Sequence, residues 1–205
     1  MKLEVNQLSA ERGGRAVFSD LSFTVDTGTL LRVTGANGAG KTTLLRILSG
    51  LGAPVSGGVR WQSDGGSILT TGEAACFVGH ANAFNESLSV TENLSYAGAL
   101  AGLVPNPDQI VSALDAFGVK ALRNRSFGAL SQGQKKRCSL ARMVLAPTRG
   151  SRAWLLDEPF VALDVDTQAL LAQLISSELA AGALVIYTSH QAVDIDAPVS
   201  RELSL

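Results

Sequence analysis

The stretch that decides the fold is GANGAGKTT, residues Gly35 to Thr43. It fits the pattern G-x-x-x-x-G-K-[ST], in which the glycines free the backbone to turn its N–H groups toward an anion. The apolar run 30–33 before it predicts a strand, and the spacing of Leu44, Leu45 and Leu48 predicts a helix over 41–49 after it. A strand, a glycine-rich loop and a helix in this order predict a phosphate-binding loop, because the helix N-terminus also attracts negative charge.

The same pattern assigns roles within the loop. Lys41 is expected to hold the β- and γ-phosphates of a nucleoside triphosphate, and the Thr42 hydroxyl to bind Mg²⁺. An ordinary glycine turn before a helix is the alternative, and the flanking strand and helix argue against it. The loop alone does not separate a kinase, a GTPase and a transporter motor. The expected nucleotide-binding residues of the loop are Gly35, Ala36, Asn37, Gly38, Ala39, Gly40, Lys41, Thr42 and Thr43.

Outward from the loop, the chain alternates between strand and helix patterns. Short apolar runs predict strands near 3–5, 21–25, 75–79, 153–156 and 184–189. Helical spacing predicts helices over 93–103, 108–116, 132–145 and 167–179. The expected fold class is α/β: one P-loop NTPase domain over 1–205, with a mixed β-subdomain at the N-terminus and a helical subdomain inserted at about 88–146.

Composition limits the choice of partners and compartment. The chain has 205 residues, 46% of them hydrophobic, and its 17 basic and 18 acidic residues include no basic block, which disfavours nucleic acid as a partner. Cys76 and Cys138 lack metal-ligand spacing and are expected to be reduced core thiols rather than redox residues. No signal peptide is apparent, and the apolar stretch 180–188 is too short to cross a bilayer. A cytoplasmic location is expected, with any membrane role supplied by another chain.

Two adjacent carboxylates follow an apolar strand in AWLLDEP, residues 153–159. Open α/β sheets bind ligands at the carboxyl edge of their strands, so this pair is expected beside the phosphate loop. Asp157 is predicted to hold Mg²⁺ directly or through water, and Glu158 to polarise the attacking water. A solvated Asp-Glu turn is the alternative. Farther on, Asp164 in VALD has the position of a helix N-cap.

A second helix N-terminus with anion-binding character occurs in LSQGQKKR, residues 130–137. One ATP cannot need two such sites on a single chain. With GANGAGKTT, LSQGQ, LLDEP, ALD and a TSH sequence ending at His190 all in order, the chain resembles an ABC ATPase over nearly its whole length. The resemblance implies an ABC nucleotide-binding domain with a RecA-like core, ATP and Mg²⁺ as cofactors, ATP hydrolysis, and an ATP-dependent head-to-tail homodimer.

The resemblance also assigns residues to that dimer. Ser131 and Gly133, with Gln134 beside them, would bind the γ-phosphate held by the opposite subunit. Asp164 resembles the D-loop acid that crosses the interface, and His190 resembles the switch histidine near Glu158.

This sequence departs from the general pattern at three positions. Gln132 replaces the commonest glycine of the signature, and His80 stands where the Q-loop glutamine is expected, which makes His80 a candidate metal contact. The aromatic residue that usually stacks on adenine is absent. Arg12 occupies the equivalent spacing; its guanidinium can stack on a base, and a solvated loop arginine is the other interpretation.

Four segments are similar to those of one subfamily, the haem-exporter ATP-binding subunits of cytochrome c maturation. They are RAVFSDLSFTV, VGHANAF, SVTENL and LLDEPFVALD. This implies separately encoded integral membrane subunits, a peripheral place at the cytoplasmic face of the inner membrane, and hydrolysis linked to release of a haem-loaded chaperone. The chain has no haem attachment motif, so haem would concern its partners.

Other functions stay open at the sequence level. The first alternative is the motor of another small exporter, for lipid, peptide or drug. A soluble ABC protein of translation or DNA repair usually has two cassettes or a long coiled-coil insertion, and this chain has neither. A kinase of a small metabolite would not explain why the chain contains LSQGQ and His190.

A docking groove for the membrane partner is expected along His80 to Asn93. Leu88 and Val90 could equally be core residues. Phe84, with polar neighbours, is predicted to be an exposed aromatic anchor.

Overall fold

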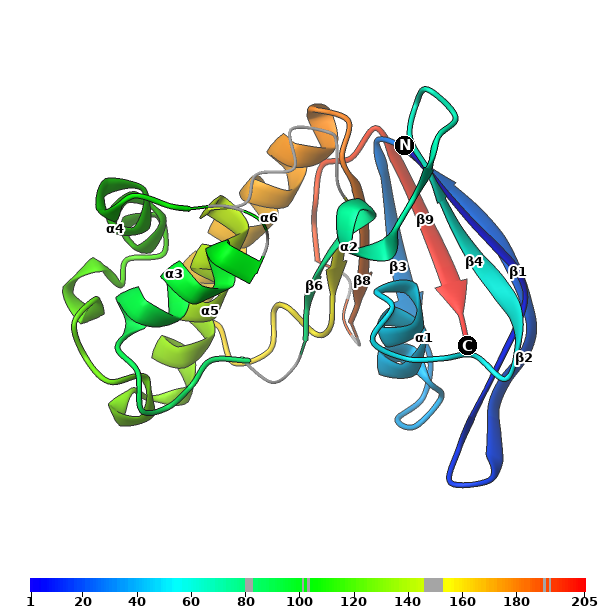
Figure 1. Cartoon of the computed structure of the whole chain (residues 1–205), viewed down its shortest axis with the longest axis horizontal. Coiled ribbons are helices and arrows are strands. Elements are labelled where there is room, and N and C mark those ends of the chain that lie inside the picture. Colours follow the sequence, from blue (N-terminus) through cyan, green and yellow to red (C-terminus); the bar gives the residue numbers. More distant parts are fainter. Residues whose placement is uncertain (80–82, 101, 103, 146–152, 190, 192) are drawn as a thin grey trace. The chain divides into compact units, whose positions relative to one another are not determined.

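The computed structural model describes residues 1–79, 83–100, 102, 104–145, 153–189, 191 and 193–205 (Figure 1). The chain divides into two compact units. Unit 1 comprises Met1–His80, Thr148–Pro159 and Ala172–Leu205, and unit 2 comprises Ala81–Pro147 and Phe160–Leu171.

Unit 1 contains two sheets. In the described residues, the first is antiparallel with the order β2-β1-β4-β5, and the second is parallel with the order β6-β7-β8-β3-β9. The antiparallel strands are β1 (Lys2–Arg12), β2 (Arg15–Asp26), β4 (Ser56–Gln62) and β5 (Ile68–Leu69). The parallel strands are β3 (Thr29–Thr34), β6 (Ala75–Val78), β7 (Ala153–Leu156), β8 (Leu184–Thr188) and β9 (Val199–Ser204).

Helix α1 (Lys41–Leu48) lies between the two sheets of unit 1 (Figure 1). Its apolar side chains join one buried cluster with residues of β1, β3, β7 and β8. Gly50, two residues beyond the last residue of the helix, closes its C-terminus. Its φ of 73° allows its N–H to bond the Ile47 oxygen at 3.0 Å while Leu51 N–H bonds the Arg46 oxygen at 2.8 Å. At the same end, the indole Nε1–H of Trp61 donates to the Leu48 oxygen at 3.2 Å and ties α1 to β4.

Unit 2 is helical. Its elements are α3 (Val90–Leu100), α4 (Pro107–Ala116), the short 3₁₀ turns η1 (Lys120–Leu122) and η2 (Phe127–Ala129), and α5 (Gln132–Leu145). Asn106 caps α4 in a reciprocal pair with Gln109, with Pro107 at the first helical position. Helix α6 (Val165–Ala180) begins in unit 2 and ends in unit 1, and the small helix α2 (Thr71–Ala74) belongs to unit 1.

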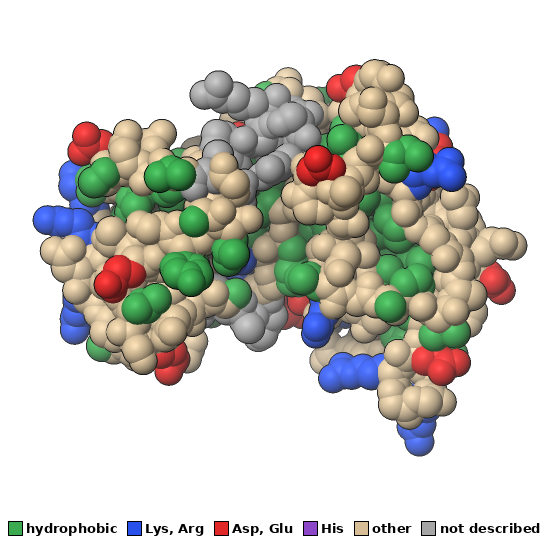
Figure 2. Space-filling model, in the orientation of Figure 1, with side chains coloured by type: hydrophobic (Ala, Val, Ile, Leu, Met, Phe, Trp, Pro, Cys, Tyr) green, Lys and Arg blue, Asp and Glu red, His purple; other side chains and the backbone are tan. Residues whose placement is uncertain are grey.

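The predicted fold class is confirmed, and several predicted elements match closely. Helix α5 and strand β7 have the predicted bounds, whereas α3 begins three residues before the predicted start at Asn93. Strands β4, β5 and β9 were not predicted. In the described part of the chain, no helix is long and apolar enough to span a membrane. Figure 2 shows positive and negative side chains interspersed on the visible face, without a field of one sign.

Candidate functional site

The predicted phosphate-binding loop, residues 35–43, joins the end of β3 to the start of α1 and is closely packed. Gly40 has a φ of 103°, and a Cβ there would lie 2.3 Å from Val17 Cγ1 and 3.0 Å from Phe18 Cδ1. Gly35 has a φ of 142°, and its Cβ would lie 2.9 Å from the Leu205 oxygen. Both positions therefore require glycine, because any side chain would combine backbone strain with a clash.

Lys41 lies over this loop. Its Nζ donates to the backbone oxygens of Gly35 at 2.7 Å and Ala36 at 3.1 Å, and the residue is 7% exposed. The ammonium is thus held at the loop beside the N-terminus of α1. A fixed cation and a helix N-terminus at one place form an anion-binding site of the kind that the sequence predicts.

Each side-chain oxygen of Asp157 accepts a hydrogen bond from a threonine hydroxyl. Thr42 Oγ1 donates to Oδ2 and Thr188 Oγ1 donates to Oδ1, both at 2.9 Å. Asp157 follows β7 and Thr188 ends β8, and these strands are parallel neighbours, so their carboxyl ends meet. Asp157 is 2% exposed and sits directly beside the first turn of α1. The structure therefore brings together Thr42 and Asp157, both predicted as metal ligands.

Glu158 has an unusual backbone. Its φ is 49°, in the left-handed region that non-glycine residues seldom adopt. Its N–H donates to Thr188 Oγ1 at 2.8 Å. The predicted water-polarising residue is thus held next to Asp157 by a hydroxyl from the adjacent strand.

The signature segment lies in unit 2 at the start of α5. Ser131 Oγ accepts the Gln134 N–H at 3.3 Å, and Ser131 N–H donates to Gln134 Oε1 at 3.1 Å, which is a capping box. A Cβ on Gly133 would lie 3.5 Å from the Ala162 oxygen, an ordinary contact distance. The exposed Ser131 therefore stands at a helix N-terminus, while the Gln134 amide already serves the cap.

Asp164 has the N-cap position that the sequence indicates. Its Oδ1 accepts the Thr167 N–H at 2.8 Å in the first turn of α6. Hydrogen bonds from the Thr167 side chain and backbone lower the pKa of Asp164. The carboxyl is fully ionised at neutral pH and exposed.

Arg12 lies at the tip of the β1–β2 hairpin, paired with Arg15 and exposed. Two side chains of β2, Val17 and Phe18, reach the predicted phosphate-binding loop and contact Gly40. Sequence reasoning missed these two and Thr188. Their only sequence signals are an apolar pair upstream of the loop and a threonine two residues before His190. His80 and His190 themselves lie outside the described residues.

Phe84 differs from the prediction. Its ring packs edge-on against Phe127, with centroids 5.0 Å apart and an interplanar angle of 61°, and the residue is only partly exposed. Val90 is fully buried and Leu88 partly buried. Phe84 is therefore less exposed than predicted, because its polar neighbours gave no hint of an aromatic partner from η2. Its role as an anchor for a membrane partner stays a prediction.

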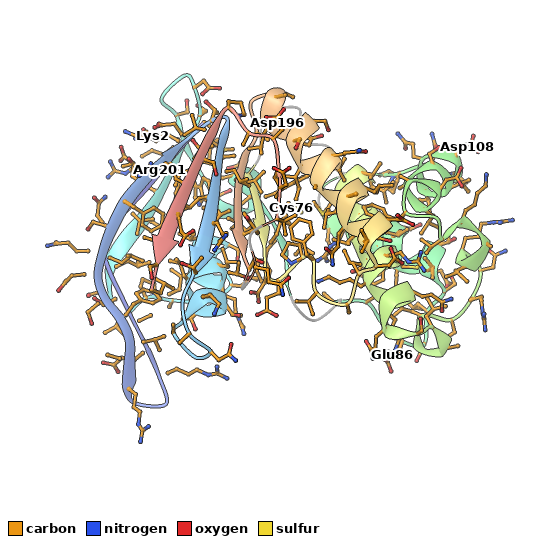
Figure 3. All side chains as sticks on the ribbon, turned by 180° about the vertical axis from the view of Figure 1, so that it is seen from behind. Lys2, Cys76, Glu86, Asp108, Asp196 and Arg201 are labelled. Carbon is orange, nitrogen blue, oxygen red and sulfur yellow. The ribbon has the colours of Figure 1, made fainter. Side chains whose placement is uncertain are left out.

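The segment after Phe84 is tied to α5. Lys135 Nζ pairs with Glu86 Oε1 at 2.8 Å and lies 5.6 Å from the centroid of the Phe127 ring. This ion pair lowers the pKa of Glu86, whose side chain is exposed and labelled in Figure 3. The segment preceding α3 is thereby fixed to the helix that begins at the signature.

Neither cysteine forms a disulfide in the described part of the chain, and only Cys138 is the core thiol that the sequence predicts. Cys138 on α5 is fully buried, and burial raises the pKa of its thiol to about 11. Cys76, labelled in Figure 3, lies on β6 and is partly exposed.

Comparison with known proteins agrees with this geometry. The ABC transporter family model matches residues 18–161. Fold, loop and family match together define the chain as an ATP-binding-cassette ATPase.

Among curated relatives, the cytochrome c biogenesis ATP-binding export protein CcmA of Albidiferax ferrireducens is 42% identical over 99% of this chain and 96% of its own length. The CcmA of Dechloromonas aromatica is 43% identical over 99% of each chain. This chain therefore belongs to the ABC transporter family and, within it, to the CcmA proteins.

Solved structures share the fold. A putative ABC transporter ATP-binding protein from Pyrococcus furiosus superposes with a TM-score of 0.78 at 28% identity, covering 99% of this chain and 98% of that one. A dimeric ATP-binding cassette in a post-hydrolysis state bound to ADP and Pi gives a TM-score of 0.76, over 92% of this chain and 88% of that one. Because the dimeric cassette is only 20% identical to this chain, its similarity shows the fold alone.

Proposed function

We propose that this chain is the ATP-hydrolysing subunit of a haem exporter of cytochrome c biogenesis. It would act peripherally at the cytoplasmic face of the inner membrane, on integral membrane subunits encoded separately. The observation that carries the proposal is the near full-length similarity to CcmA proteins, whose name states ATP-binding and export in cytochrome c biogenesis.

Nucleotide binding is assigned to the loop 35–43. Its backbone N–H groups and the Lys41 ammonium would hold the β- and γ-phosphates once the phosphates replace the loop carbonyls that Lys41 now contacts. Arg12 at the hairpin tip is proposed to stack on the base.

Thr42 and Asp157 would hold Mg²⁺. Their hydroxyl and carboxylate oxygens lie 2.9 Å apart and are the donors that this ion prefers. In the part of the chain that the structure describes, no group of three or more His, Cys, Asp and Glu side chains is placed to hold a metal ion. Phosphate and water oxygens would complete the shell. When bound, Mg²⁺ neutralises phosphate charge.

Glu158 would orient the attacking water, with His190 as the switch residue at the γ-phosphate and His80 as a further contact on the metal side. Both histidine roles rest on the motif positions alone.

A head-to-tail homodimer accounts for the second anion site. The exposed Ser131 and the backbone at Gly133 form the N-terminus of α5, which would bind the γ-phosphate held by the opposite subunit. Gln134 supports that site through its cap with Ser131, and Asp164 would cross the interface while capping α6.

The test begins with the tagged chain purified from membranes, followed by identification of the subunits that accompany it. Deletion of the chain should abolish cytochrome c assembly, and the wild type should restore it. The Lys41→Ala variant should not restore assembly, because the loop has no other cation. Normal cytochrome c assembly without the chain, or copurification with subunits that export lipid, peptide or drug, would assign it to another exporter.

A further inference from the structure

Thr188 is a polar residue at the end of a completely buried strand. Every residue of β8 is buried, and Thr188 has no exposed surface. A buried hydroxyl destabilises a protein unless it is hydrogen-bonded. The contacts of this hydroxyl therefore indicate why a threonine occupies the position.

The hydroxyl connects Asp157 to the backbone of Glu158. Its one proton is donated to Asp157 Oδ1 at 2.9 Å, and it accepts the Glu158 N–H at 2.8 Å. The other Asp157 oxygen accepts Thr42 Oγ1 at 2.9 Å. One chain of hydrogen bonds thus runs from the first turn of α1 through Asp157 and Thr188 to Glu158.

The bond to Glu158 restrains an uncommon backbone conformation. At a φ of 49°, a glutamate persists only where its surroundings fix the main chain. The Thr188 oxygen supplies such a restraint at the amide of the residue itself. Loss of this bond would remove one restraint on the main chain that directs the Glu158 carboxylate.

We infer that Thr188 is a positioning residue for ATP hydrolysis, setting the carboxylate of Asp157 and the backbone of Glu158 through one hydroxyl. The inference rests on the proposed roles of Asp157 and Glu158. Thr188 does not touch the reacting atoms. Its contribution is separable from packing, because valine has nearly the same shape and lacks the hydroxyl.

The experiment compares Thr188→Val with Thr188→Ser. Loss of a hydrogen bond to a buried carboxylate predicts a kcat about 10- to 100-fold lower for Thr188→Val. ATP affinity measured without Mg²⁺ should stay within about twofold of the wild type, because the loop and Lys41 are untouched. Thr188→Ser keeps the hydroxyl and should restore kcat to within about threefold. Thr29→Val removes another buried hydroxyl, at the opposite end of β3 from the loop, and should leave kcat unchanged.

Hydrogen exchange at the Glu158 amide gives a second readout, which a packing role would not move. The amide should be protected in the wild type and in Thr188→Ser and should exchange faster in Thr188→Val. If Thr188→Val does not fold, Thr188→Cys replaces it and should give intermediate turnover, because a thiol is a weak donor. Equal kcat for the serine and valine variants, or wild-type kcat and protection in Thr188→Val, overturns the inference.

Asp157→Asn and Glu158→Gln separate this result from the proposed site. If these two variants hydrolyse ATP normally, the site assignment itself fails. If they are inactive while Thr188→Val is fully active, only the inference about Thr188 fails.

Discussion

The two buried tryptophans of unit 1 allow one hydrogen bond at the end of α1 to be measured. Trp61 is 2% exposed and its Nε1–H donates to the Leu48 oxygen at 3.2 Å. Trp154 on β7 has no exposed surface, and none of the described residues accepts a bond from its Nε1. Replacing either tryptophan by phenylalanine removes the same atoms, but only Trp61→Phe also removes a hydrogen bond between described residues.

The expected costs follow from these environments. The lost volume destabilises either variant by about 1–2 kcal/mol. Trp61→Phe also leaves the Leu48 oxygen without its indole donor, which adds about 1–3 kcal/mol. Trp154→Phe adds no such cost, because the donor that it removes has no described partner.

The assay is unfolding followed by circular dichroism, since the substitutions alter tryptophan fluorescence. For a chain of this size, the added 1–3 kcal/mol corresponds to a melting temperature roughly 2–12 °C lower for Trp61→Phe than for Trp154→Phe. Equal melting temperatures, or a lower one for Trp154→Phe, would refute the claim that this bond anchors α1 to β4. Urea midpoints at 25 °C serve as an independent check.

Four further predictions concern catalysis, the chemistry of Cys138, the pH dependence of stability and the packing of Phe84. Glu158→Gln removes the anionic group and should give dimers with ATP that do not hydrolyse it; monomers on gel filtration with ATP would contradict the proposed head-to-tail homodimer. In a Cys76→Ser background, Cys138 should resist alkylation at about pH 8, because burial raises its pKa from 9.0 to about 11 and leaves little thiolate; rapid labelling of the folded protein would contradict this. The raised pKa also means that the stability from the neutral thiol is complete below about pH 9 and is lost as the pH rises through about 11. Phe84→Asp should lower the melting temperature, whereas Phe84→Leu should lower it less, because the Phe84 ring packs on Phe127; an unchanged melting temperature for both would show that this packing does not stabilise the fold.

The sequence predicts those parts of the fold that local patterns control. The loop at Gly35 to Thr43 and the helix at 132–145 carry fixed spacings within one short segment, and the structure contains both where expected. Strand β9 has the sequence VSRELS, in which polar residues dominate, and it joins the parallel sheet through pairing with β3. Its strand conformation depends on a partner far away in the sequence, so no local pattern reveals it.

The candidate site shows the same division between local and distant information. Lys41, Thr42 and Asp157 are predicted because each chemical role requires one residue type at one motif position. The packing of Phe84 and the place of Thr188 were not predicted because both depend on contacts: a ring supplied by η2 in one case and a carboxylate from the neighbouring strand in the other. A motif identifies the residues that touch a ligand, whereas the side chains that hold those residues in place become visible once the strands are paired. Thr188 belongs to this second group, since the same threonine at the end of an unpaired strand would have neither Asp157 nor the Glu158 amide within reach.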